Sequence, residues 1–208
     1  MLEQQVRPSE VLNPHVLKAL EEVKRSQFVD ESLSGLAYAD TELPIGFGQV
    51  MLPPVLVGRL LQALDVQSNE DVLEIGTGSG YCTALLAKLA HHVFSVELIA
   101  ELSEIAQQHL VDADINNVTF YTGDASQGWP LSDRVDVIIS SAAFVSVPDE
   151  FLQSLNIGGR MLAVVGDGAL MSVNIIRRVT EWEWQTDSLF ETVIPAMINT
   201  EPKAEFEF

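Results

Sequence analysis

Short apolar runs alternate with amphipathic segments between residues 71 and 166. The runs predict buried strands at 72–75, 93–96, 118–121, 135–140 and 160–165. Between the second and third runs, apolar residues recur at the spacing of one helix face, from Leu102 to Ala113. Alternating strands and helices predict a parallel sheet with helices on both faces.

The two ends of the chain have different patterns. "NPHVLKALEEV" places Asn13 as a cap and Pro14 in the first turn of a helix. A second helix is expected from Leu56 to Leu64, so the N-terminal part is predicted to cap the sheet. "MSVNIIRRVT" and "SLFETVIPAM" read as two strands separated by a gap too short for a crossover helix, which predicts an antiparallel ending.

One further helix is expected in "VPDEFLQSL", which carries acids in its first turn. The following "NIGG" is predicted to end that helix, because glycine adopts the left-handed conformation of a C-terminal cap.

Charge and cysteine content limit the possible functions. The 208 residues hold 30 acids against 11 bases, a formal net charge of -19. Such a surface repels phosphate backbones and anionic lipids, so we expect neither a nucleic-acid nor a membrane partner. The single cysteine, Cys82, excludes an internal disulfide. With neither a signal pattern nor a membrane-length apolar run, the protein is expected to be cytoplasmic.

The histidines do not predict a metal site. His91 and His92 are adjacent at the start of an expected strand, where neighbouring side chains point to opposite faces. His15 and His109 fall on other elements, and no cysteine cluster accompanies them. We therefore expect no bound metal.

The stretch "DVLEIGTGSGY", residues 71–81, indicates a ligand site. An apolar strand runs into three glycines and then into a helix, and glycines at such a turn allow the backbone to approach a ligand. Glu97 ends the next strand, where a carboxylate can accept hydrogen bonds from both hydroxyls of a ribose. The pattern predicts nucleoside binding over a purely structural turn.

The glycine spacing favours one kind of nucleoside. A dinucleotide fingerprint needs glycine or alanine where Tyr81 stands, and the spacing here is E-x-G-x-G-x-G with Glu74 inside the strand. A second acid suits a ligand with positive charge and no phosphate, such as S-adenosylmethionine. Asp124, after the third strand, is placed to meet an adenine amino group, although alone it also fits a turn or cap aspartate.

Several stretches together resemble the protein-L-isoaspartate O-methyltransferase family. "VLEIGTGSGY" is similar to its cofactor motif, "AYADTELPIGFGQ" to the stretch before its substrate loop, and "GGRMLAVVG" to its fifth strand. "EQQVRP" and "FVDESLSGLAYAD" fit its N-terminal region, so the resemblance covers residues 2–166. It implies a Rossmann-like class I methyltransferase fold, with a seven-stranded, mostly parallel sheet and an antiparallel C-terminal strand.

The resemblance also implies an organisation and a set of site residues. We expect one domain, with a helical cap and substrate loop at 1–66, a cofactor-binding core at 67–166 and C-terminal strands at 167–208. The loop from Ile45 to Pro54 is expected to face the acceptor carboxylate. The residues implied around the cofactor are Glu74, Gly76, Thr77, Gly78, Ser79, Gly80, Glu97, Leu98, Asp124 and Ala125, and those of the loop are Ile45, Gly46, Gln49, Val50, Leu52 and Pro54.

The substrate loop departs from the family pattern. The family commonly reads G-x-G-Q-T-I-S-x-P, whereas this chain reads "GFGQVMLPP", so that Val50 replaces the threonine and Leu52 the serine. The catalytic residues are therefore left unassigned. A lost hydrogen bond costs about 1–3 kcal/mol, or roughly 5- to 150-fold in rate, which does not abolish methyl transfer. The tail "SLFETVIPAM" also departs from the family's closing strand.

The resemblance implies an S-adenosylmethionine-dependent enzyme that methylates isoaspartyl carboxylates in damaged proteins. We expect it to be a monomer or weak dimer. One alternative is a methyltransferase with a more apolar or small carboxylate acceptor, to suit Leu52. Another is a cofactor-binding protein with little catalysis, and an NAD-dependent enzyme is more distant. Cofactor binding without turnover would favour the inert module, whereas turnover on acceptors lacking isoaspartate would favour the altered enzyme.

Overall fold

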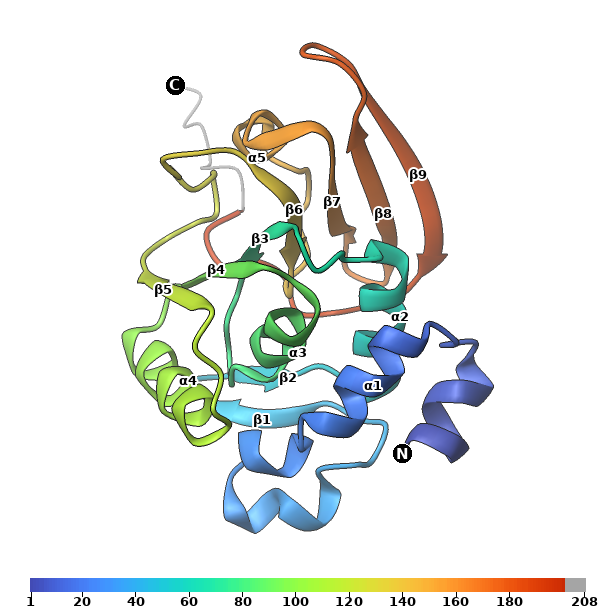
Figure 1. Ribbon diagram of the computed structural model, residues 1–208, viewed down its shortest axis with the longest axis vertical. Helices are drawn as coiled ribbons and strands as arrows, with labels where there is room; N and C mark the ends of the chain where they lie inside the picture. Colours follow the sequence, from blue (N-terminus) through green and yellow to red (C-terminus); the bar gives the residue numbers. More distant parts are fainter. Residues whose placement is uncertain (201–208) are drawn as a thin grey trace, which may run out of the picture.

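A seven-stranded sheet forms the centre of the computed structural model, which describes residues 1–200. Its order is β5-β4-β3-β6-β7-β8-β9 (Figure 1). The strands from β3 to β7 pair in parallel, and β7, β8 and β9 pair antiparallel. The bounds are β3 (Asp71–Ile75), β4 (His92–Glu97), β5 (Val118–Thr122), β6 (Val135–Ser140), β7 (Leu155–Asp167), β8 (Leu170–Arg178) and β9 (Trp184–Glu191). This confirms the Rossmann-like fold with an antiparallel ending.

Five α-helices accompany the sheet in residues 1–200: α1 (Pro14–Glu22), α2 (Pro54–Leu64), α3 (Tyr81–Leu89), α4 (Ala100–Asp112) and α5 (Asp149–Gln153). The predicted cap of α1 is confirmed, because the Asn13 side chain accepts from the backbone N–H groups of His15 and Val16. The short helical turns η1 (Leu2–Val6), η2 (Arg7–Ser9), η3 (Arg25–Phe28) and η4 (Glu31–Leu36) complete the N-terminal part.

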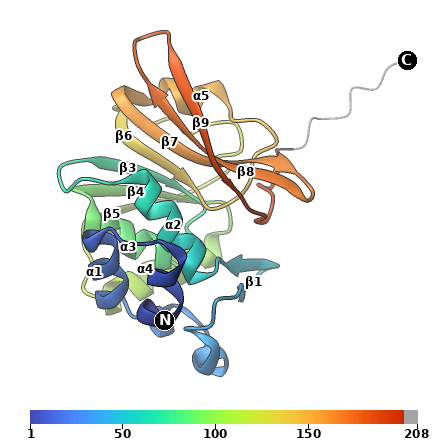
Figure 2. The same ribbon diagram turned by 90° about the vertical axis from the view of Figure 1, so that its right-hand side faces the viewer.

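Two apolar cores lie on opposite faces of the sheet, because neighbouring strand residues point to opposite sides. Val72 faces a core shared with α1, α2 and α3, whereas Leu73 faces a second core that includes Phe151 of α5. Figure 2 shows α1, α2 and α3 together on one side of the sheet and α5 on the other. Helices do occupy both faces, but the second is covered mainly by α5 and by irregular segments that contribute Ala125 and Phe144.

The loop that was expected to face the acceptor forms a β-hairpin, which the sequence patterns did not predict. Strands β1 (Leu43–Gly46) and β2 (Gln49–Met51) pair antiparallel, separate from the main sheet. Its turn has positive φ at Gly46, Phe47 and Gly48. Two of these are glycines, which adopt that conformation at little cost. The hairpin therefore has a defined shape at the edge of the pocket described below.

Two expected boundaries were wrong. The glycines of "NIGG" do not cap α5: they lie in β7, beside a register shift where β7 pairs with β6. Gly158 has φ +86° there, so its left-handed backbone conformation occurs at an irregularity in the strand and not at a helix end. The last strand begins earlier than expected, at Trp184, and ends at Glu191. Backbone pairing with β8 decided its position, because its exposed residues carry little hydrophobic signal.

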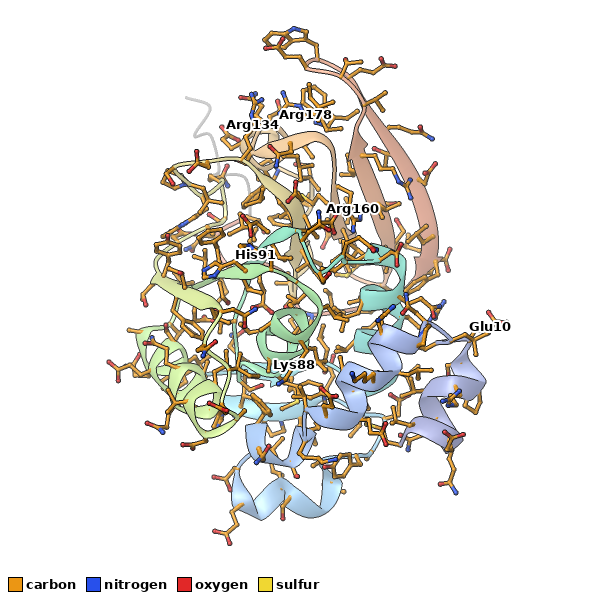
Figure 3. All side chains as sticks on the ribbon, viewed as in Figure 1. Glu10, Lys88, His91, Arg134, Arg160 and Arg178 are labelled. Carbon is orange, nitrogen blue, oxygen red and sulfur yellow. The ribbon has the colours of Figure 1, made fainter. Side chains whose placement is uncertain are left out.

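Arg160, labelled in Figure 3, connects the helical layer to the sheet through hydrogen bonds. From β7, its Nη2 donates to the carbonyl of Asp65 at 2.7 Å, at the end of α2, and its Nη1 to Glu70 Oε1 at 2.8 Å. Guanidinium–carboxylate bonds of this kind are strong and directional. They hold the end of α2, and hence the start of β3, in a fixed place.

None of the helices described in residues 1–200 has both the length and the apolar character needed to cross a bilayer.

Candidate active site

The loops that follow β3, β4, β5 and β6 meet at one edge of the sheet. Neighbouring strand ends are joined there by backbone hydrogen bonds of 2.9 Å: Gly76 N to the Val96 carbonyl, Gly123 N to the Glu97 carbonyl, and Ser141 N to the Ile75 carbonyl. Ligands of open α/β sheets bind outside the carboxyl ends of the strands, where the strand order reverses. In this sheet the order reverses at β3, from which the chain goes first to β4 and later to β6.

A pocket, here called the first pocket, lies at this edge. Its walls come from the glycine turn, the ends of β4, β5 and β6, the β1–β2 hairpin and the C-terminal segment. The lining comprises Ile45, Gln49, Val50, Ile75, Gly76, Gly78, Val96, Glu97, Leu98, Leu102, Gly123, Asp124, Ala125, Ser141, Ala142, Pro195, Ala196, Met197 and Ile198. The expected nucleoside residues Glu97, Leu98, Asp124 and Ala125 are thus brought together.

Glu97 is held in a fixed orientation in the first pocket. Its Oε2 accepts from Gly78 N at 2.8 Å and its Oε1 from Ile99 N at 3.0 Å, and only 6% of the residue is exposed. Each carboxylate oxygen retains a further lone pair that can accept from a ligand hydroxyl. The carboxylate therefore joins the glycine turn to the start of α4 and still presents acceptors to the pocket.

Asp124 contributes a second acid just after β5, the strand that pairs with β4. Its Oδ1 accepts from Ser126 N at 2.9 Å, and its Oδ2 accepts from Asn199 Nδ2 at 2.9 Å. The bond from Ser126 is the main reason why the pKa of Asp124 lies below its usual value. Asp124 is therefore an anionic acceptor at the rim of the pocket.

The sequence patterns did not identify the C-terminal wall of the first pocket. Residues 195–198 line it after leaving β9, held where Ala143 N donates to the Pro195 carbonyl and Met197 N to the Ala143 carbonyl. "SLFETVIPAM" read as a strand throughout, and no local signal distinguishes a strand end from a pocket wall. The contact with Ala143 is tertiary, 52 or more positions away along the chain.

The three glycines of the turn have different roles. All have positive φ, +88° at Gly76, +55° at Gly78 and +84° at Gly80. Gly76 and Gly78 line the first pocket, so their backbone is available to a ligand. Gly80 does not line it: a Cβ there would lie 2.9 Å from Leu110 Cδ1 and 3.1 Å from Ala106 Cβ. Gly80 thus allows α4 to pack against the turn.

A second pocket adjoins the first and shares Val50, Gly76, Gly78 and Ser141 with it. Its lining is mostly apolar, and its polar groups are neutral hydroxyls and a thiol. The lining comprises Val50, Met51, Leu52, Val57, Leu60, Gly76, Thr77, Gly78, Ser79, Tyr81, Cys82, Ile139, Ser140 and Ser141. Thr77 and Ser79 of the expected cofactor set therefore face this second pocket.

The position of Leu52 is set partly by Arg25, which sequence reasoning missed. Arg25 Nη2 donates to the Leu52 carbonyl at 2.7 Å, and its guanidinium lies 4.9 Å from the centre of the Tyr81 ring. Arg25 is fully buried, and desolvation lowers its pKa from the usual value. The Leu52 side chain, 7% exposed, joins the core while bordering the second pocket.

Some expected site residues do not line either pocket. Gly46 belongs to the hairpin turn, and Pro54 begins α2. Glu74 is wholly buried beneath the glycine turn, where its Oε2 accepts from Thr83 Oγ1 and from Ser95 Oγ at 2.7 Å. Desolvation raises the pKa of Glu74 to about 7.

The two pockets fit an adenosyl ligand without phosphate. Glu97 and Asp124 offer acceptors to hydroxyl and amino donors, and among residues 1–200 neither lining contains a lysine or arginine. Within this part of the chain, a pyrophosphate would meet carboxylates with no cation to offset its charge. The Ile45 side chain of the hairpin lies close to the glycine turn, because a Cβ on Gly78 would lie 3.1 Å from Ile45 Cδ1.

The two adjacent histidines have different partners, on β3 and β5. His91 Nδ1 is 2.9 Å from Asp71 Oδ1, and His92 Nε2 is 2.9 Å from Thr119 Oγ1. Residues 1–200 contain no group of three or more His, Cys, Asp or Glu side chains placed to hold a metal ion.

Comparison with known proteins places the chain in a family. The model of the protein-L-isoaspartate(D-aspartate) O-methyltransferase family matches residues 1–197. The protein-L-isoaspartate O-methyltransferase of Syntrophus aciditrophicus is 40% identical over 181 residues, which cover 87% of this chain and 83% of that protein. The corresponding protein of Myxococcus xanthus is 44% identical over 156 residues, or 75% of this chain and 74% of its relative.

The fold agrees with a solved structure. A Plasmodium falciparum protein described as a putative protein-L-isoaspartate O-methyltransferase, in complex with S-adenosyl-L-homocysteine, superposes with a TM-score of 0.81. The match covers 92% of this chain and 94% of that one at 16% identity, which supports the fold alone. From the family match, the relatives and the geometry of the strand ends, we conclude that this chain belongs to the protein-L-isoaspartate(D-aspartate) O-methyltransferase family.

Proposed function

We propose that this protein transfers a methyl group from S-adenosylmethionine to the free carboxylate of isoaspartyl residues in proteins. Membership of the family makes it an S-adenosylmethionine-dependent O-methyltransferase. The observation that carries the proposal is that hairpin residues of the substrate loop, Ile45 and Gln49, line the same pocket as Glu97 and Asp124. Residues of the loop and the residues proposed to bind the nucleoside therefore line one pocket.

The first pocket is suited to the adenosyl part of the cofactor. Glu97, with both oxygens already fixed by backbone N–H groups, would accept from the ribose hydroxyls. Asp124 and Ala125 would border the adenine edge, with Leu98 beside the ring. The second pocket, which begins at the glycine turn, would take the methionyl end. When bound, S-adenosylmethionine supplies a methyl group on a positively charged sulfur, which a nucleophile can attack.

The chain's own residues need only bind, orient and exclude water. A carboxyl group with a pKa of about 4 is already ionised at neutral pH, so no general base is required. Catalysis then depends on alignment, which can supply a large part of the rate enhancement. The hairpin and residues 195–198 would supply that alignment by closing the pocket from two sides.

The experiment uses methyl-labelled S-adenosylmethionine with an isoaspartyl peptide and the matched aspartyl peptide. Selective labelling of the isoaspartyl peptide is expected. Binding of the cofactor, measured separately by calorimetry, with no labelling of that peptide would reject the isoaspartyl assignment while keeping the cofactor site.

A second acceptor class is favoured by one observation: the lining of the second pocket is mostly apolar where Val50 and Leu52 replace the family's hydroxyls. A small carboxylate with an apolar substituent would fit this surface. Labelling of such acids, in the absence of isoaspartyl peptide methylation, would support this acceptor. Binding without turnover on any acceptor would instead indicate a cofactor-binding protein.

The proposed setting is cytoplasmic protein repair, in which the methyl ester cyclises to a succinimide with release of methanol, and water then opens the succinimide partly to aspartate. We propose that the protein acts as a monomer or weak dimer, without nucleic-acid or membrane partners, in keeping with its net charge of -19. We also propose one domain with the cap and loop at 1–66, the core at 67–166 and the strands at 167–208. Residues 201–208 of the last part lie outside the described residues.

A further inference from the structure

Glu74 forms the buried end of a chain of hydroxyl groups that reaches the second pocket. Its Oε2 accepts from Ser95 Oγ at 2.7 Å, and Ser95 Oγ lies 2.6 Å from Thr77 Oγ1. Thr77 lines the second pocket, whereas Glu74 and Ser95 lie behind the lining and have no exposed surface. The carboxyl group is therefore linked to the pocket through two hydroxyls.

Ionised Glu74 fixes the hydrogen-bonding group that Thr77 presents to the pocket. Ser95 has a single hydroxyl hydrogen, which it donates to Glu74, so Thr77 must donate its own hydrogen to Ser95. In that arrangement, Thr77 has no hydrogen left for the pocket and offers only lone pairs. A ligand ammonium group would find an acceptor there.

No positively charged side chain in residues 1–200 pairs with the buried carboxylate of Glu74. Its Oε1 is buried and accepts no hydrogen bond, and no lysine or arginine is among its hydrogen-bond or ion-pair partners in residues 1–200. The titratable groups that act on it are Cys82 of α3 and Glu97 of β4, while its β6 partner Ile139 is apolar. Desolvation and the neighbouring Glu74 raise the pKa of the Cys82 thiol, so Cys82 stays neutral and leaves the charge of Glu74 uncompensated.

A cationic ligand group would provide this compensation. The described residues that line the second pocket include no charged side chain, so a positive charge placed there has Glu74, two hydroxyls away, as a counter-charge behind the wall. S-adenosylmethionine carries a sulfonium and an ammonium group against one carboxylate. Favourable interaction with the ionised carboxyl must lower the proton affinity of that carboxyl, by thermodynamic linkage.

We propose that Glu74 is a positioning residue that does not touch the cofactor, and that binding of S-adenosylmethionine releases a proton from Glu74 to solvent. The inference rests on the cofactor of the proposed function but not on the identity of the methyl acceptor. Ionised Glu74 then orients Ser95 and Thr77 so that the second pocket accepts hydrogen bonds from the bound cation.

Calorimetric titration with S-adenosylmethionine in buffers of different ionisation enthalpy measures the released proton directly, without any acceptor. If binding favours ionised Glu74 tenfold, about half a proton should be released per cofactor between pH 6 and 7. The Glu74→Gln variant should not release this half proton when it binds the cofactor. The ratio of the variant's Kd to the wild-type Kd should rise from about 1 at pH 5.5 to about 10 at pH 8.

The comparison separates Glu74 from other titrating groups. Groups other than Glu74, the ligand's own amino group among them, are present in both proteins, so the difference between wild type and Glu74→Gln reports Glu74 alone. S-adenosylhomocysteine lacks the sulfonium charge: equal proton release with this ligand would assign the effect to the ammonium group, and smaller release to the sulfonium. Either result supports the proposal.

Ser95→Ala provides a second variant that leaves the carboxyl in place. Removing a hydrogen bond to the ionised form should raise the midpoint of the pH dependence by about one unit. Identical proton release in wild type and Glu74→Gln, or an unmoved midpoint in Ser95→Ala, would overturn the proposal. Failure of isoaspartyl methylation would leave these binding results intact, so the two assignments fail separately.

Discussion

Asn199 donates a hydrogen bond from Nδ2 to Asp124 Oδ2 over 2.9 Å and so connects the C-terminal segment to the loop after β5. The two residues are 75 positions apart in the sequence. Residues 195–198, just before Asn199, form one wall of the first pocket, and Asp124 belongs to the neighbouring wall. The bond therefore holds two walls of the pocket together at the rim.

Removal of this bond should weaken cofactor binding modestly. Asn199→Ala is expected to raise the Kd for S-adenosylmethionine by about 2- to 5-fold, because an exposed hydrogen bond contributes only about 0.5–1 kcal/mol. Calorimetric titration measures the change. Asn116→Ala, on an exposed residue outside both pockets, is the matched control and should leave the Kd unaltered. An unchanged Kd for Asn199→Ala would show that the segment is held by its backbone bonds to Ala143 alone.

Loss of the Glu97 carboxylate should have a much larger effect. Glu97→Ala leaves Gly78 N and Ile99 N without their acceptors and removes the proposed partner of the ribose hydroxyls. Hydrogen bonds to charged groups contribute about 1.5–3 kcal/mol, so the Kd should rise by about 100-fold. The measurement is cofactor titration, with circular dichroism to verify the fold. A Kd within a factor of three of wild type would remove Glu97 from the binding site.

Substitution of Leu52 tests the acceptor assignment. Leu52→Ser restores the hydroxyl of the family pattern and should raise kcat/KM for an isoaspartyl peptide by about tenfold, if one hydrogen bond is regained. Leu52→Ala removes the same bulk without adding a hydroxyl and separates the two effects. Both variants should lose about 2–4 kcal/mol of stability in urea unfolding, because the side chain is 7% exposed and packed in the core. Equal activity of the two variants would mean that bulk, not the missing hydroxyl, limits this acceptor.

Two glycines with nearly the same φ should respond differently to alanine. Gly80 (φ +84°) would place a Cβ 2.9 Å from Leu110 Cδ1, whereas Gly158 (φ +86°) has open space around it. Gly158→Ala should cost only the backbone strain of about 1 kcal/mol, and Gly80→Ala about 2–4 kcal/mol because α4 must also move. Urea unfolding of both variants measures the difference. Equal costs would indicate that α4 shifts freely and does not fix the turn.

Stability should fall with rising pH because of Glu74. Its pKa is raised from 4.5 to about 7 in the folded protein, chiefly by desolvation. The protonated carboxyl is therefore favoured by folding, and its contribution is complete below pH 4.5 and lost as the pH rises through about 7. Between pH 5 and 8, wild type should lose about 2–3 kcal/mol relative to Glu74→Gln in chemical unfolding. A constant difference between the two proteins would mean that Glu74 has an ordinary pKa.

The sequence by itself determined the fold class and half of the site. Strand periodicity located β3, β4, β5 and β6, because buried parallel strands are short apolar runs whatever their neighbours. The glycine spacing and the acids at the strand ends then indicated the nucleoside pocket, since parallel strands place their carboxyl ends at one edge. The structure brings Glu97 and Asp124 to one pocket on this principle.

Only the tertiary structure decided the remaining features of the site. The wall at 195–198 depends on backbone bonds to Ala143, the loop position on a bond between Arg25 and the Leu52 carbonyl, and neither leaves a local pattern. Glu74 lies in the cofactor motif, yet burial beneath the turn keeps it from the pocket lining. Motifs specify residue types at a spacing, whereas desolvation and long-range contacts depend on what the rest of the chain packs around them.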